Sequence, residues 1–262
     1  FVFWTRFAKP MLPLLSEIDD MGFPFVFQYT IVDYPRILDQ ASPSLSARIR
    51  AFQALAKRIG PDRVLWRYDP IVITPDLSPA YHVERFHKLA SALAASTRRC
   101  TISFLEFYAK TRRRLAALGD KGAFDLPGIE KRELALRLAE IASSHGISLS
   151  ACCQAWREDS EIPASACIDA SLLNKLFGIP ATPGRDSGQR ALCNCAPSRD
   201  LGMYDSCGFG CRYCYATVSS QAARDRRKTH DPGSPSLLGH HSPSSPATQQ
   251  TGQASLPFWG SR

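Results

Sequence analysis

The stretch SLSARIRAFQALAKRIGPDRVLWRYDPIVI, residues 44–73, decides the fold. Its first half starts with serines, repeats apolar residues at helical spacing and ends at Gly60, which predicts a helix over residues 44–60. Its second half is rich in β-branched and aromatic residues, which predicts a buried strand from Arg63 onward. A helix that leads directly into a buried strand is the repeating unit of an α/β protein.

The same pattern continues on both sides of this stretch. Strand-like runs begin at residues 1, 25, 99 and 146, and helical patterns cover residues 80–96 and 130–146. Five strands with helices between them imply parallel pairing through right-handed crossovers. Because no glycine-rich phosphate loop follows any strand, we expect a partial or complete (β/α) barrel-like parallel sheet rather than a dinucleotide-binding fold.

The composition divides the chain into three predicted regions. Residues 1–178 form the barrel-like α/β domain, residues 179–239 form a cysteine-rich module, and residues 240–262 form a disordered tail rich in Pro, Ser, Gly and Gln. The longest apolar stretch, residues 22–32, is too short to span a membrane, so no membrane partner is expected. The chain begins without a basic leader, so we expect a cytoplasmic protein and a fragment of a longer one.

The formal net charge of +8 leaves two interpretations open. The basic residues lie in helix-like segments such as KTRRRLAALGDK, residues 110–121, and RDRRK, residues 224–228. These segments are either solvated helix faces or contacts to the phosphates of a nucleic acid.

The nine cysteines point to metal chemistry. An odd count in a chain without a secretory signal disfavours a disulfide framework. Cys207, Cys211 and Cys214 have the spacing C-x3-C-x2-C, which lets each thiolate bind a different iron of one 4Fe-4S cluster and leaves the fourth iron open. The alternatives are unliganded thiols or a zinc ion, held by four cysteines from the same segment: Cys193, Cys195, Cys211 and Cys214.

Two resemblances extend this prediction. The loop CGFGCRYCYA, residues 207–216, resembles the cluster-binding loop of the radical S-adenosylmethionine superfamily, with Tyr213 as the aromatic residue before the last cysteine. The chain as a whole resembles the bacterial domain-of-unknown-function family 1848. That resemblance rests on FWTRFAKPML at residues 3–12, WRYDPIVI at 66–73, CIDASLL at 167–173, the stretch from GQR to CYA at 188–216, and HDPGSPSLLG at 230–239. It also implies that this chain lacks an N-terminal β/α segment and is truncated relative to the family.

The resemblances imply the cofactors and their ligands. Cys207, Cys211 and Cys214 would bind a 4Fe-4S cluster whose open iron chelates S-adenosylmethionine, and Tyr213 would contact the adenine or shield the cluster. An electron donor such as a flavodoxin or ferredoxin would then be a partner. Further ligands, for a second iron–sulfur cluster or a zinc ion, would be Cys152, Cys167, Cys193 and Cys195.

Polar residues at strand ends are candidates for substrate contact, because a (β/α) barrel carries its site at the carboxyl ends of its strands. The catalytic candidates are Arg67, Asp69 and Glu106, although Arg67 and Asp69 would equally form a buried pair that braces a strand. His82 and His87 are expected on the surface.

Two functions of different class follow from these observations. The first is an iron–sulfur enzyme similar to radical S-adenosylmethionine enzymes, with an unknown substrate. The alternative is a non-catalytic protein, stapled by zinc or an iron–sulfur cluster, that binds nucleic acid or a protein partner.

Overall fold

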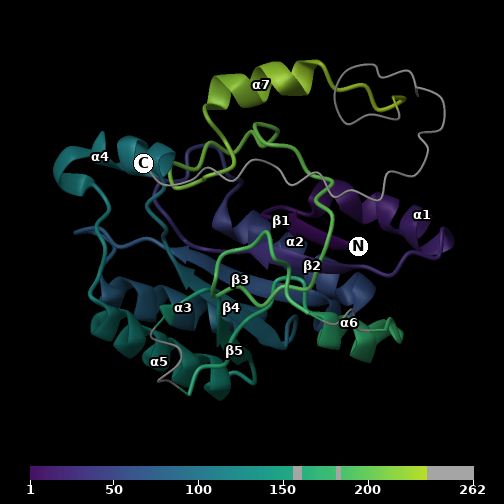
Figure 1. Ribbon diagram of the computed structural model, residues 1–262, viewed down its shortest axis with the longest axis horizontal. Coiled ribbons are helices and arrows are strands. Elements are labelled where there is room, and N and C mark those ends of the chain that lie inside the picture. The colour runs from purple at the N-terminus through teal and green to yellow at the C-terminus, as the bar shows by residue number, and fades with distance from the viewer. Residues whose placement is uncertain (156–160, 181–183, 235–262) are drawn as a thin grey trace. The chain divides into compact units, whose positions relative to one another are not determined.

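Five parallel strands form the centre of the protein in the computed structural model, which describes residues 1–155, 161–180 and 184–234 (Figure 1). They follow one another in space in the order of the sequence and confirm all five predicted strands: β1 (Val2–Thr5), β2 (Val26–Thr30), β3 (Val64–Ile71), β4 (Arg99–Phe104) and β5 (Ser148–Ala151). The described sheet is open between β1 and β5, so it has the partial form of the predicted barrel-like fold.

Helices connect these strands. The three predicted from periodicity are confirmed as α2 (Leu45–Ile59), α3 (Pro79–Leu93) and α5 (Gly128–Ser144). The others are α1 (Leu15–Asp20), α4 (Ala109–Ala116), α6 (Ala170–Phe177) and α7 (Ser220–Lys228), with 3-10 turns at Lys9–Leu14, Pro61–Arg63 and Gly119–Lys121.

Local signals set the ends of α2. The Ser44 hydroxyl accepts a hydrogen bond from the Ala47 N–H at 3.3 Å, which satisfies one of the free donors of the first turn. Gly60 ends the helix at φ 92°, a backbone angle that glycine adopts without steric cost. The chain therefore turns into β3 where the sequence predicts it.

One face of the sheet is apolar and carries the main core. Phe27 in β2, Trp66 in β3 and Ile102 in β4 are fully buried and belong to one cluster with apolar residues of α2, α3 and α5. Figure 1 shows α3 and α5 side by side along the sheet. Right-handed crossovers between successive neighbouring strands place their helices on the same face, as seen here.

The opposite face of the sheet is polar toward the carboxyl ends of the strands. Alternation along the strands aligns Thr30, Arg67, Thr101 and Ser150 in one row across β2 to β5. Nearer the amino ends, α6 covers this face through Leu172, which packs in a small cluster with residues of β2 and β3. The polar row lies where a closed barrel would have its interior, and it forms the floor of the candidate site.

The chain divides into two compact units. The first comprises Phe1–Arg199 and Phe209–Tyr215, and the second comprises Asp200–Gly208 and Ala216–Arg262. The disordered tail predicted for residues 240–262 lies outside the described residues.

Candidate metal centre

Five cysteines from three separate segments meet above the polar face of the first unit. They are Cys152, Cys153, Cys167, Cys193 and Cys195, here called the five-cysteine group. All five carry free thiols, and all except the half-buried Cys167 are buried. Four of these residues are the predicted second ligand set, and the structure brings them together.

The sulfur atoms of this group contact one another and nearby backbone. The Sγ atoms of Cys152 and Cys153 are 3.7 Å apart. The N–H of Cys167 donates to Cys195 Sγ at 3.1 Å, and the N–H of Cys195 lies 3.5 Å from Cys193 Sγ. Backbone donors to cysteine sulfur favour the thiolate form, which is the form that binds metal.

Arg67 supplies positive charge to this group. Its Nη1 donates to Cys167 Sγ at 2.9 Å, while its Nη2 pairs with Asp69 Oδ2 at 2.6 Å. Hydrogen bonds from the Cys152 and Cys195 thiols, together with Arg67, lower the pKa of Cys167. The same contact to Cys167 raises the pKa of Cys152. Within the group, Cys167 is therefore the thiol whose thiolate form the surroundings favour most, with Arg67 as the neighbouring cation.

Cys153 was not among the predicted ligands. Its backbone has φ 51°, in the left-handed region that costs a non-glycine residue about 1–2 kcal/mol. This conformation coincides with the contact between its sulfur and that of Cys152. The signal in the sequence is the doubled cysteine of SACCQ, residues 150–154, of which the family resemblance implies only Cys152 as a ligand.

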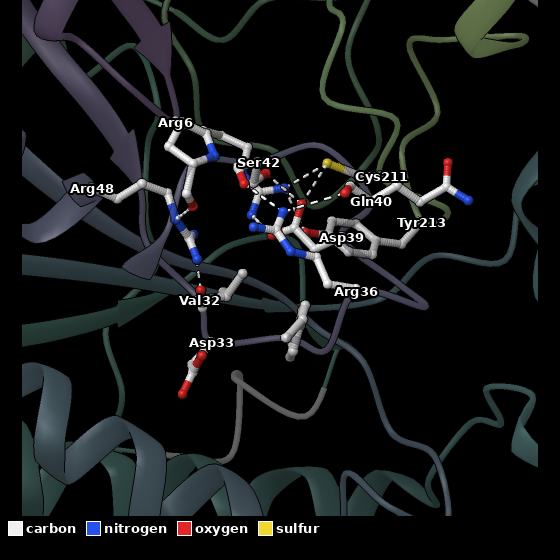
Figure 2. A network of polar contacts seen from close by, with 12 residues as sticks. Arg6, Val32, Asp33, Arg36, Asp39, Gln40, Ser42, Arg48, Cys211 and Tyr213 are labelled. Atoms are coloured by element: carbon white, nitrogen blue, oxygen red, sulfur yellow. Dashed lines mark hydrogen bonds and ion pairs between the residues drawn. The ribbon is translucent and has the colours of Figure 1, made fainter. Parts of the chain in front are cut away.

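The cysteine loop, Phe209–Tyr215, is part of the first unit and is held to the rest of it by backbone and side-chain hydrogen bonds. The Arg212 N–H donates to the Leu38 carbonyl at 2.9 Å, and the Ala41 N–H donates to the Phe209 carbonyl at 2.9 Å. Arg114 donates to the Cys214 carbonyl. The side chain of Arg6 also reaches the loop, from the segment after β1 (Figure 2).

Arg6, Asp39, Cys211 and Tyr213 form one polar network (Figure 2). Arg6 Nη1 lies 2.6 Å from both Cys211 Sγ and Tyr213 Oη, and Arg6 Nη2 lies 2.6 Å from Asp39 Oδ2. Burial raises the pKa of the Cys211 thiol to about 12, although Arg6 opposes this effect. The Tyr213 ring is buried and packs edge-on against Tyr34, so it is part of the core of this unit.

Cys207 belongs to the second unit, and its side chain is exposed. In that unit the Asp205 side chain accepts a hydrogen bond from the Val218 N–H at 2.5 Å, and the Asp205 N–H donates to the Ala216 carbonyl at 2.9 Å. Of the three predicted loop ligands, Cys211 and Cys214 therefore lie in one unit and Cys207 in the other.

The donor chemistry fits a thiolate-bound metal, although the side chains are not arranged around an ion. Among residues 1–155, 161–180 and 184–234, no three Cys, His, Asp or Glu side chains are placed so that they hold a metal. Clustered free thiols are the ligands that iron–sulfur clusters and zinc prefer. In addition, the buried Nε–H of Arg6 finds no hydrogen-bond partner in the described part of the chain. An unsatisfied donor beside Cys211 is consistent with a further group binding at that place.

Of the three catalytic candidates, Arg67 lies in the middle of β3, Asp69 near its carboxyl end, and Glu106 just after β4. Arg67 and Asp69 form a buried ion pair, and the Ser103 hydroxyl also donates to Asp69. Glu106 is half exposed and pairs with Arg190 at 3.0 Å. Glu106 also lines a cavity of about 260 Å³, whose other polar side chains are Arg112, Asp125, Lys131 and Gln154.

The prediction that His82 lies on the surface was wrong, because this side chain is fully buried. The Val72 carbonyl can only accept, so His82 Nε2 carries the proton and donates to it at 3.0 Å. His82 Nδ1 then accepts from the Tyr68 hydroxyl at 2.8 Å. The periodicity of the helix does not reveal that His82 has a buried partner, because that partner, the Tyr68 hydroxyl, lies in β3. His87 is exposed, as predicted.

His82 predicts an acid-sensitive fold. Burial lowers its pKa from 6.5 to about 4, so the unfolded chain binds a proton more readily than the folded chain. This stabilising contribution is present above pH 6.5 and is lost as the pH falls toward 4, by about 3 kcal/mol at most. Urea unfolding of the metal-free chain at pH 7 and pH 4.5 is expected to show a smaller loss of stability for His82→Gln than for wild type. The exposed His87→Gln should behave as wild type, and an equal loss in all three chains would refute the assignment.

No described helix is long and apolar enough to cross a membrane.

Comparison with known proteins identifies the family. No curated protein matches the chain. A family model described as "Domain of unknown function (DUF1848)" matches residues 1–216, which include both cysteine groups and the whole of the sheet-forming unit. The chain therefore belongs to the DUF1848 family.

Proposed function

We propose that this protein is an iron–sulfur protein of the radical S-adenosylmethionine type, acting on an unknown substrate. The observation that carries the proposal is the convergence of five free thiols, from three segments, on the polar face of a parallel sheet. Alanine or serine side chains would pack in the same space with a lower risk of oxidation, so packing alone does not explain five cysteines. Its function is to bind a metal centre through thiolates.

The position of Arg67 supports a cluster at the five-cysteine group. Several thiolates buried together repel one another, and a buried cation next to them reduces that cost. The Arg67 guanidinium provides this charge at 2.9 Å from Cys167 Sγ. Asp69 fixes the guanidinium by accepting from both Nε and Nη2, so the charge is held in place.

The cysteine spacing of residues 207–214 supports a second cluster, which would bind S-adenosylmethionine. The spacing of Cys207, Cys211 and Cys214 supplies three thiolates, so one iron remains for S-adenosylmethionine. When bound, such a cluster supplies one electron to cleave the sulfonium of that cofactor. The chain's own residues hold the loop, through Arg6 and Arg114, and Tyr213 shields it from solvent.

The cavity beside Glu106 is the place we assign to the substrate. It lies at the carboxyl end of β4, where enzymes with parallel sheets bind their ligands. Its Gln154 donates through Nε2 to the Cys152 and Cys153 carbonyls, which links the cavity to the five-cysteine group. An electron donor such as a flavodoxin or ferredoxin is the protein partner that this chemistry requires.

One observation favours a second candidate function, a zinc-stapled binding protein. Four thiolates in a tetrahedron about 2.3 Å from zinc stand about 3.8 Å apart. The separation of Cys152 Sγ and Cys153 Sγ, 3.7 Å, is close to this value. In this alternative, the exposed basic residues of α7 would contact nucleic acid.

Metal analysis of the anaerobically purified chain distinguishes these functions. We expect iron and sulfide but no stoichiometric zinc, and an electron paramagnetic resonance signal after reduction that shifts when S-adenosylmethionine is added. Cys211→Ala should abolish the shift. Cys100→Ala is the matched control, because Cys100 is a fully buried thiol in β4, outside both cysteine groups. Zinc without iron, or a signal indifferent to the cofactor, would replace the first function with the second.

A further inference from the structure

Arg6 occupies an unusual position for a buried arginine, because its guanidinium contacts a cysteine sulfur. Its side chain is 13% exposed, and that of its partner Asp39 is 2% exposed. The charges of Arg6 and Asp39 already balance each other, so this ion pair needs no third group. Nevertheless, Arg6 Nη1 also donates to Cys211 Sγ at 2.6 Å, across 205 residues of sequence.

Asp39 links the Cys211 sulfur to a second polar side chain (Figure 2). Cys211 Sγ lies 3.4 Å from Asp39 Oδ1, which also accepts a hydrogen bond from the Ser42 hydroxyl. Asp39 Oδ1 therefore has a partner that does not depend on what the Cys211 sulfur binds.

Backbone contacts also hold the segment that carries Cys211. Asp39 and Cys211 pair as an antiparallel bridge, and Arg212 donates to the Leu38 carbonyl at 2.9 Å. Tyr213, two residues after Cys211, accepts from the same Arg6 Nη1 at 2.6 Å. Side chain and backbone together hold Cys211 in one orientation, with its sulfur against a cation.

We propose that Arg6 is a positioning residue for Cys211, and that it raises the reduction potential of the cluster that the cysteine loop binds. This inference rests on the proposed function. A hydrogen bond from a cation to a ligand sulfur stabilises the reduced cluster more than the oxidised one, because the reduced cluster carries one more negative charge. Asp39 and Ser42 support this role by fixing the guanidinium.

The test measures the midpoint potential of the iron–sulfur signal that Cys211→Ala abolishes, during titration with dithionite. In Arg6→Met, the ratio of reduced to oxidised cluster at the wild-type midpoint is expected to fall about tenfold, a shift of about 59 mV for one electron. Arg6→Lys keeps the charge but loses the forked contact, so its ratio should fall about two- to threefold. Arg58→Met is the matched control, because Arg58 pairs with Asp19 on the surface, away from the cysteines.

Each outcome decides the inference. Loss of iron in Arg6→Met, with an unchanged melting temperature of the metal-free chain, supports positioning. An unchanged potential and iron content in Arg6→Met, or an equal shift in Arg58→Met, overturns the inference alone. If Arg6→Met does not fold, Arg6→Lys decides, and a wild-type potential there counts against the inference. A wild-type chain that binds no iron overturns the proposed function as well.

Discussion

Replacement of Cys167 by alanine is expected to remove the metal of the five-cysteine group and to leave the centre at the cysteine loop in place. Cys167 is at the centre of the group, since its sulfur accepts from Arg67 and its backbone N–H donates to Cys195. Metal content per chain should fall by one complete centre. Because metal binding contributes directly to folding, the metal-loaded variant should also melt below the metal-loaded wild type, and above the chelator-treated wild type because it keeps the centre at the cysteine loop.

The control for Cys167→Ala is Cys100→Ala. Both changes remove one thiol, but Cys100 lies in the apolar core, where burial raises the pKa of its thiol far above the usual range and keeps it protonated. The control should therefore keep its full metal content and lose only the free energy of a smaller core side chain. Full metal content in Cys167→Ala, or no effect of chelator on the wild-type melting temperature, would show that the five-cysteine group binds no metal.

Replacement of Arg67 by methionine is expected to lower the free energy of unfolding by about 3–5 kcal/mol, because it leaves a buried carboxylate without its cation. The Asp69 side chain is 19% exposed and accepts both from Arg67 and from Ser103. The double variant Arg67→Met with Asp69→Asn removes the unpaired charge and should recover most of the loss. Urea unfolding of the metal-free wild type, the single variant and the double variant measures the three free energies of unfolding.

The exposed pair of Arg58 and Asp19 provides the reference for Arg67. These side chains are 46% and 37% exposed, so Arg58→Met should cost no more than about 1 kcal/mol. If Arg67→Met unfolds like wild type, Arg67 does not brace the strand end, and its role as a substrate contact gains support. The experiment thus separates the two roles that the sequence left open for this residue.

The fold was predictable because its signals are local. The serine start, the helical spacing and the terminal glycine of residues 44–60 lie within one segment, and Ser44 and Gly60 act in the structure as expected. Strand order required only that consecutive parallel strands be neighbours, which is the common arrangement. The sequence does not reveal the polar row of Thr30, Arg67, Thr101 and Ser150, because strand register determines it.

The candidate site was predictable in its residue types but not in its contacts. The cysteines of the five-cysteine group come from segments about 15 and 26 residues apart, so only the fold brings them together. Arg6 was overlooked because its partners Asp39 and Cys211 are 33 and 205 residues away. His82 was misplaced for the same reason, since its Tyr68 partner comes from the preceding strand.

The 205-residue separation of Arg6 and Cys211 also fixes an order of events during synthesis. A ribosome that adds about 5–20 residues per second makes Cys211 roughly 10–40 s after Arg6. During that interval Asp39 is already available to pair with Arg6 and to keep the guanidinium in place. The five-cysteine group is complete at Cys195, before the loop emerges. In a growing chain, the five cysteines of this group are therefore all synthesised before the loop, which is added last to the segments that it contacts.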